Sequence, residues 1–268
     1  MIHIEHLAKS FSAPAGGARR LALKRTPPRI VHAARDVNLH APDGHITGLL
    51  GPNGAGKTTT LRMLAGLIPA DAGRMQVDDI DVSARPRAAL ARMGVLSDAR
   101  GLYPRLTARE NIAYYGRLQG MPADAADARA ESLASMFDMR ALLDRRTDGF
   151  SQGERMKTAL ARALVHDPAN IILDEPTNGL DVLATRALRE SLRWLRTPAG
   201  GAKCIVFSTH IMQEVERLCD SVVVVAHGRT VASGTVDELL AQTGETDFEE
   251  AFVKLAFAEE QAQQGAAA

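Results

Sequence analysis

The sequence predicts an α/β fold in which a block of helices interrupts a domain that begins and ends with β-strands. Two observations lead to this prediction. Short apolar runs of strand length recur along the chain, for example at 46–50, 171–173 and 221–226. Residues 98–165 have instead mainly the apolar spacing of helices. Because no apolar run approaches 18 residues, we do not expect the chain to span a membrane.

The N-terminal segment predicts two strands on either side of a basic insertion. Apolar residues alternate around Ile2 and Ile4, and again around Val37 and Leu39. Residues 12–31, between them, are rich in Gly, Pro, Ala and Arg. We interpret this insertion as a variable hairpin tip. The alternative is a basic contact, through Arg19, Arg20, Lys24 and Arg25, with lipid headgroups or a partner protein.

A glycine-rich turn follows the apolar run at 46–50. Residues 51–58, GPNGAGKT, match the pattern GxxxxGK[ST], with a predicted strand before them and helical spacing up to Pro69 after them. The glycines allow the backbone N–H groups to point at phosphate oxygens. We expect Lys57 to reach the β- and γ-phosphates and Thr58 to bind Mg²⁺. The nucleotide-binding residues would be Gly51, Pro52, Asn53, Gly54, Ala55, Gly56, Lys57, Thr58 and Thr59.

Capping signals define the helical block. Thr107 and Glu110 form one predicted capping box, and the sequence ADAADARAESLASMF forms an amphipathic run after it. Ser151 and Glu154 form a second capping box, which opens a helix with regular apolar spacing. Capping alone does not account for Gly153.

An apolar strand at 171–175, IILDE, delivers two carboxylates at its end. Asp174 suits Mg²⁺, and Glu175 suits a base that orients an attacking water. Alone, such a pair is usually a plain strand end, but the glycine-rich turn earlier in the chain favours a catalytic role. Two further segments, KCIVFSTH and SVVVVAHGRTVASG, predict a strand and a hairpin that turns at His227 and Gly228.

These motifs, in this order, resemble the nucleotide-binding subunit of an ATP-binding-cassette (ABC) transporter. The resemblance implies a P-loop NTPase fold with a RecA-like core, an N-terminal antiparallel β subdomain, and an α-helical subdomain at 98–165 that carries the family's signature. It covers residues 1–236 as a single ABC ATPase domain, followed by an acidic helical tail at 237–268. It implies ATP and Mg²⁺ as cofactors and ATP hydrolysis as the activity.

The resemblance also implies roles for individual residues. Phe11 would stack on adenine; the alternative is a core residue. His210 would contact the γ-phosphate, and with Glu175 and Lys57 it would form the catalytic set. Asp181 occupies the family's D-loop. The signature, acting on the ATP of a second copy, would be Ser151, Gln152, Gly153 and Glu154.

The sequence departs from the family's pattern at two places. The third signature position holds Gln152 instead of Gly, and the fifth holds Glu154 instead of Gln. Asp98 stands where the family usually has a glutamine that contacts Mg²⁺ and couples to the membrane domain. A carboxylate there adds negative charge near phosphate, which puts its role in doubt.

One cassette in a chain without a membrane span implies two partners: a second copy of the ATPase, and a separate multi-span membrane subunit docked near 98–120. The chain would then lie in the cytoplasm, on the inner face of the membrane. The segments SDARGLYPRLTARENI and GFSQGERMKTALARALVHDP are most similar to exporters of the sodium-efflux and drug-efflux type. Alternatives from other classes are a cassette acting on ribosomes or DNA, and a catalytically silent regulatory subunit.

The net charge and the number of cysteines limit these alternatives. The 268 residues include 32 Lys+Arg and 32 Asp+Glu, and the zero balance argues against an extended nucleic-acid surface. The charge is unevenly placed, since residues 1–35 are basic and 237–268 are acidic. With only Cys204 and Cys219 present, we expect buried, reduced thiols.

Overall fold

One continuous β-sheet organises the chain. The computed structural model describes residues 1–13, 29–97 and 101–258. Within them, ten strands follow the order β5-β4-β1-β2-β10-β9-β3-β8-β7-β6. The strands are β1 Ile2–Ala13, β2 Arg29–Ala41, β3 Ile46–Leu50, β4 Ala72–Val77, β5 Ile80–Asp81, β6 Met93–Leu96, β7 Asn170–Asp174, β8 Cys204–Thr209, β9 Ser221–Ala226 and β10 Arg229–Gly234.

The N-terminal part of the sheet is antiparallel. β1 pairs with β2 on one side and with β4 on the other. The pairing of β1 with β2 continues to Ala13 opposite Arg29, so the two ends of the basic insertion lie side by side. The predicted insertion contacts of Arg19, Arg20, Lys24 and Arg25 fall outside the described residues.

The C-terminal part of the sheet is a parallel core. Strands β6, β7, β8, β3 and β9 run parallel to one another. Alternate side chains of β8 enter different apolar clusters: Ile205 and Phe207 pack with α6, whereas Val206 packs on the side of α1. Because helices cover both faces of this part of the sheet, the sequences of these strands are continuous apolar runs.

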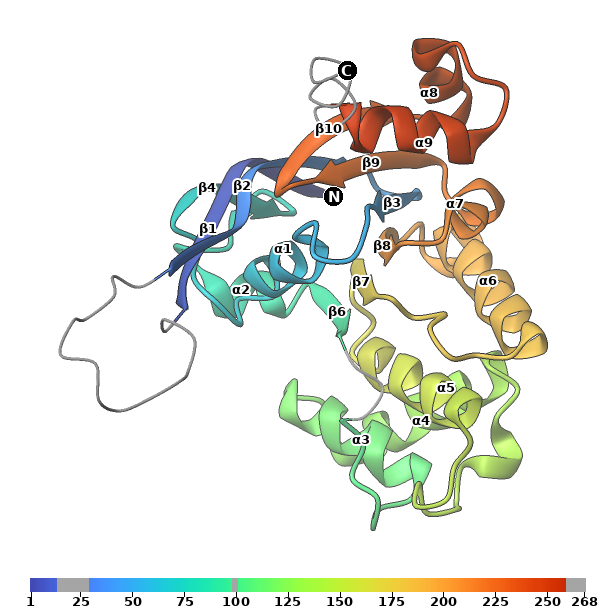
Figure 1. Cartoon of the computed structure of the whole chain (residues 1–268). Helices are drawn as coiled ribbons and strands as arrows, with labels where there is room; N and C mark the ends of the chain where they lie inside the picture. The colour runs from blue at the N-terminus through green and yellow to red at the C-terminus, as the bar shows by residue number, and fades with distance from the viewer. Residues whose placement is uncertain (14–28, 98–100, 259–268) are drawn as a thin grey trace, which may run out of the picture.

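Helices lie at several places around the sheet (Figure 1). α1 packs between β2 and β7, α6 packs on β3 and β8, and α3, α4 and α5 form a separate helical lobe. The helices are α1 Lys57–Leu64, α2 Pro86–Leu90, α3 Ala108–Leu118, α4 Ala123–Met136, α5 Gln152–Leu164, α6 Val182–Arg196, α7 Met212–Leu218, α8 Val236–Thr243 and α9 Phe248–Ala256.

Local sequence signals decide where several helices begin and end. Both predicted capping boxes are present, Thr107 with Glu110 at α3 and Ser151 with Glu154 at α5. The expectation that the helix after the glycine-rich turn continues to Pro69 is wrong. It ends at Leu64, because Gly66 takes a positive φ of 66°.

The C-terminal segment packs against the sheet. The predicted hairpin turns at His227 and Gly228, whose φ angles are 50° and 77°. After it, α8 and α9 bury Leu239, Phe248 and Phe252 in a third apolar cluster together with side chains of β9. Within its described part, residues 237–258, the acidic tail is therefore helical and contributes to the core.

Two further predictions concern single features. Among the helices that the structure describes, none is long and apolar enough to cross a membrane. Cys204 and Cys219 are free thiols, and burial raises the pKa of each to about 12. Both therefore stay protonated at neutral pH, as expected for reduced structural cysteines.

Candidate functional site

The glycine-rich turn connects β3 to α1 and packs closely against neighbouring backbone. Gly56 is the N-cap of α1 with φ 106°, and a Cβ there would lie 2.3 Å from the carbonyl oxygen of Ala33. A Cβ on Gly51 would lie 2.2 Å from the carbonyl oxygen of Val225. Only glycine fits at these two positions. Since no side chain caps α1, the amides of its first turn are left for an anion.

Lys57 lies folded over the turn. Its ammonium donates to the carbonyl oxygens of Gly51, at 2.8 Å, and Pro52, at 3.2 Å. The same nitrogen lies 3.4 Å from Oε1 of Glu175. The side chain is buried, so its charge is directed into the loop and away from bulk solvent. This places a cation at the spot where the phosphate-loop motif requires one.

Two carboxylates end strand β7, as the sequence predicts. Oδ1 of Asp174 accepts hydrogen bonds from the hydroxyls of Ser208, at 2.6 Å, and Thr58, at 3.3 Å. The next residue, Glu175, accepts at Oε2 from Nδ1 of His210, 2.7 Å away. Because a carboxylate can only accept, this nitrogen of His210 carries the hydrogen. Lys57, Asp174, Glu175 and His210 therefore converge on the turn.

The residues around Thr58 fit a divalent cation. The Thr58 hydroxyl and the Asp174 carboxylate offer oxygen donors, which Mg²⁺ prefers. Among the described residues, no group of three or more His, Cys, Asp or Glu side chains could hold a metal. Mg²⁺ sites commonly use one or two protein oxygens together with substrate phosphates.

A cavity of about 480 Å³ is lined by Lys57, Thr58, Glu175 and His210, but not by Asp174. Other residues of the turn and Asn178 also line it. Another part of its wall is the β2 segment Val31, His32 and Ala33. Its size is typical of a small-molecule site. The residues expected to bind ATP that line it are Asn53, Gly54, Ala55, Gly56, Lys57, Thr58 and Thr59.

Phe11, the expected adenine-stacking residue, does not line this cavity. It lies on β1 directly opposite Val31 of β2, which does line it. Opposite residues of an antiparallel pair project from the same face of the sheet, so Phe11 is one strand away from the cavity wall. Its ring is 41% exposed, with the Lys9 ammonium 5.6 Å from the ring centre. The alternative of a core residue does not fit this exposure.

The signature residues do not line the cavity. Ser151 caps α5 by accepting from the backbone N–H of Glu154, and none of residues 151–154, all described, lines the cavity. The Gln152 side chain donates to the backbone oxygen of Asn178 at 2.8 Å and lies over Gly179. The unusual Gln152 thus connects the signature to the loop that follows Glu175.

Asp181 begins the next helix. Its carboxylate accepts from the backbone N–H of Ala184 at 2.8 Å, which caps α6. Val182 and Leu183 follow it with exposures of 83% and 78%. Asp98, at the position where the family usually has glutamine, falls outside the described residues.

Sequence reasoning missed two residues of the site. Ser208 bonds Asp174 through its hydroxyl, and the same hydroxyl accepts from the backbone N–H of Glu175 at 3.0 Å. The signal that could have identified Ser208 is its position at the end of the strand in KCIVFSTH, which pairs with the acidic strand in the sheet. Asn178 lines the cavity, but no local pattern marks it.

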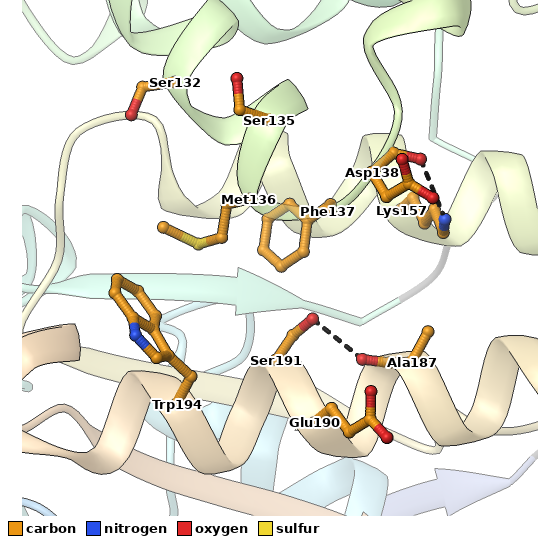
Figure 2. Close-up of a pocket in the computed structure, with 10 residues that line it drawn as sticks. All are labelled: Ser132, Ser135, Met136, Phe137, Asp138, Lys157, Ala187, Glu190, Ser191 and Trp194. Atoms are coloured by element: carbon orange, nitrogen blue, oxygen red, sulfur yellow. Dashed lines mark hydrogen bonds between the residues drawn. The ribbon is translucent and has the colours of Figure 1, made fainter.

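A second cavity, of about 740 Å³, lies between the helical lobe and α6 (Figure 2). Met136 and Phe137 come from the end of α4, and Ser191 and Trp194 face them from α6. None of the predicted site residues lines it. Next to this cavity, Phe137 and Met156 of the lobe and Leu188 and Leu192 of α6 belong to one apolar cluster, so the cavity is a local gap in the packing.

Comparisons with known proteins identify the family. The ABC transporter family model matches residues 34–178. The ABC transporter ATP-binding protein NatA of Bacillus subtilis strain 168 is 45% identical over 212 residues, 79% of this chain and 85% of that protein. The Nod factor export ATP-binding protein I of Paraburkholderia xenovorans strain LB400 is 42% identical over 205 residues, 76% of this chain and 66% of that protein.

Solved structures agree with the fold. The ATP-binding subunit of an ABC transporter superposes with a TM-score of 0.77 at 26% identity, and the match covers 95% of this chain and 98% of that one. A dimeric ATP-binding cassette in a post-hydrolysis state with ADP and Pi has a TM-score of 0.73 at 22% identity, covering 88% and 98%. The chain therefore belongs to the ABC transporter family, in which it is an ATP-binding cassette with the family's ATPase activity.

Proposed function

We propose that this ATPase works as a head-to-tail pair of cassettes that powers export through a separate membrane subunit. One observation carries the pairing. The phosphate-binding turn, Glu175 and His210 line the cavity, but none of the signature residues 151–154 does. A second copy would supply Ser151 and Gly153, and each pair would then hold two ATP molecules.

In this proposal, the residues around one cavity have different roles in ATP binding and hydrolysis. Lys57 leaves its carbonyl partners for the β- and γ-phosphates, and the amides at the start of α1 hold the same phosphates. Thr58 and Asp174 would hold Mg²⁺, which when bound offsets phosphate charge. Glu175 accepts a proton from water in line with the γ-phosphate, and His210 holds that carboxylate in place through its Nδ1–H.

The adenine lies, in this proposal, at the β2 wall. Val31 lines the cavity, and Phe11 projects from the same face of the sheet on the next strand. The base would contact Val31 directly and reach Phe11 at its outer edge. This keeps the proposed role of Phe11 but makes Val31 its closer contact.

The face proposed for the membrane subunit lies on the helical lobe near 98–120. Tyr103 and Leu118 are 45% and 63% exposed there. The Tyr103 ring packs edge-on to Tyr114, with 5.6 Å between ring centres. Exposed aromatic and aliphatic side chains next to one another are typical of contact surfaces. Docking there would hold the cassette at the cytoplasmic face of the membrane.

Export is supported by the relatives, and the cargo is the finer part of the proposal. The Nod factor relative is named for export. Our leading candidate for the cargo is Na⁺, because the segments around 97–112 and 149–168 resemble sodium-efflux and drug-efflux exporters. A drug or another small molecule is the second candidate, since the ATPase subunit itself does not contact cargo.

Reconstitution tests this proposal. The chain is purified with the multi-span membrane protein that remains bound to it, placed in liposomes and given ATP. We expect ATP-dependent flux of Na⁺ and no flux with the Lys57→Ala variant. Flux of a drug without Na⁺ flux would replace the sodium assignment, and co-purification with ribosomes or DNA would contradict the export role.

A further inference from the structure

A buried arginine lies in the third turn of the signature helix α5. The Arg162 side chain is 8% exposed, and burial lowers the pKa of its guanidinium. Among the described residues, no carboxylate acts on this charge. Burying a cation without a carboxylate is unfavourable unless other groups satisfy it, so the contacts of Arg162 define its role.

Those contacts join three segments of the helical lobe. Nη1 of Arg162 donates to the carbonyl oxygen of Gly101 at 2.5 Å. Its Cζ lies 4.5 Å from the ring centre of Tyr115 on α3, a cation–π geometry. Gly101 begins the described segment that follows β6 and residues 98–100. One side chain therefore connects α5, α3 and this segment.

The same segment is also fixed just before α5 begins. The buried hydroxyl of Thr147 donates to the carbonyl oxygen of Tyr103 at 2.9 Å. The buried Asn111 side chain accepts from the Tyr103 backbone N–H at 2.8 Å. Thr147 precedes Ser151 by four residues. Residues 101–106 are thus tied to the signature helix at two points, one before its first turn and one in its third turn.

We infer that Arg162 is a positioning residue, which holds the signature at the start of α5 in a fixed position relative to residues 101–106. This inference rests on the proposed function, in which Ser151 acts on the ATP of a second copy. Because Tyr103 is part of the face proposed for the membrane subunit, a shift of that face moves Gly101 and Tyr103. The Arg162 and Thr147 contacts then transmit this shift to the signature.

The test compares three variants of the full chain. Arg162→Met removes the guanidinium but keeps an unbranched side chain, and replacing a buried ion in this way is often neutral for stability. Arg162→Lys keeps a cation that can still reach Gly101 and Tyr115. Arg109→Met is the matched control, since Arg109 lies in the same lobe but donates to Glu131 and Asp144, each at 2.8 Å.

Three quantities are measured: kcat for ATP hydrolysis, the Kd for ATP, and the Tm. The Kd is measured at a protein concentration too low for two copies to pair. We expect Arg162→Met to lower kcat at least about tenfold relative to Arg109→Met, because a small displacement of a positioning group costs up to about 100-fold. Its Kd for ATP should stay within about twofold, since the phosphate loop is on another element. Its Tm should fall no more than that of the control, and Arg162→Lys should recover most of kcat.

Equal kcat values for Arg162→Met and Arg109→Met would overturn the inference. So would a rise in the Kd for ATP that matches the loss in kcat, because a general packing defect has that signature. A wild-type chain that neither hydrolyses ATP nor pairs would instead contradict the proposed function, and this inference with it. The wild-type measurements therefore separate the two failures.

Discussion

Glu175 shows how a single residue is held in a demanding conformation at the site. Its φ is 50°, the left-handed region that non-glycine residues rarely adopt. Its backbone N–H donates to both the carbonyl and the hydroxyl oxygen of Ser208, at 3.2 and 3.0 Å. These bonds offset a conformational cost of about 1 to 2 kcal/mol. The result is a carboxylate directed at Lys57 and His210.

Glu175→Gln should abolish turnover while leaving ATP binding intact. The amide cannot accept a proton from water, and loss of a general base typically lowers the rate by at least about 100-fold. The ATP-bound pair should then accumulate, visible by size-exclusion chromatography, while phosphate release stops. Glu190→Gln on α6, whose exposed carboxylate pairs with the neighbouring Arg186, should behave as wild type. Normal phosphate release by Glu175→Gln would exclude Glu175 as the base.

At the scale of elements, locally encoded features could be predicted from the sequence. The capping boxes at Thr107 and Ser151 and the turn at His227 and Gly228 depend on residues within four positions of one another. The phosphate-binding turn belongs to this group, because its glycine spacing determines its shape.

Features that depend on distant segments could not be predicted in this way. Ser208 bonds Asp174 across 34 positions, and Gln152 bonds Asn178 across 26. Only the order of strands in the sheet and the packing of the lobe bring these pairs together. Likewise, the resemblance implied adenine stacking for Phe11, but only the pairing of β1 with β2 shows that Val31, which lies opposite Phe11, lines the cavity.

Because the turn packs against β2, we expect alanine substitutions at two of its glycines to differ in their cost to the free energy of unfolding. Gly56→Ala combines a φ of 106° with a Cβ 2.3 Å from the Ala33 oxygen, whereas Gly54→Ala, with φ 82°, meets nothing within 4 Å. We expect Gly56→Ala to cost about 2 to 4 kcal/mol of unfolding free energy. Gly54→Ala should cost only about 1 kcal/mol. Urea unfolding measures both, and equal losses would show that β2 does not constrain the turn.

At the scale of the whole molecule, the net charge of zero includes the opposite charges of a basic N-terminal segment and an acidic C-terminal segment. Residues 1–35 have an excess of basic over acidic side chains, and the acidic tail is in its described part packed on β9 and β10 through Phe248 and Phe252. Between them, the sheet presents the cavity, and the helical lobe presents the signature. In the proposed head-to-tail pair, the cavity and the signature of each chain would be two half-sites that the second copy completes.

The most direct test of this account mixes two inactive variants. Lys57→Ala removes the phosphate cation, and Ser151→Asn replaces the signature hydroxyl with a side chain that caps helices equally well. In a head-to-tail pair, a mixed dimer keeps one intact site, so an equal mixture should recover up to about one quarter of the wild-type ATPase rate. Phosphate release measures it. If the mixture hydrolyses ATP no faster than either variant alone, the site is not shared between two copies.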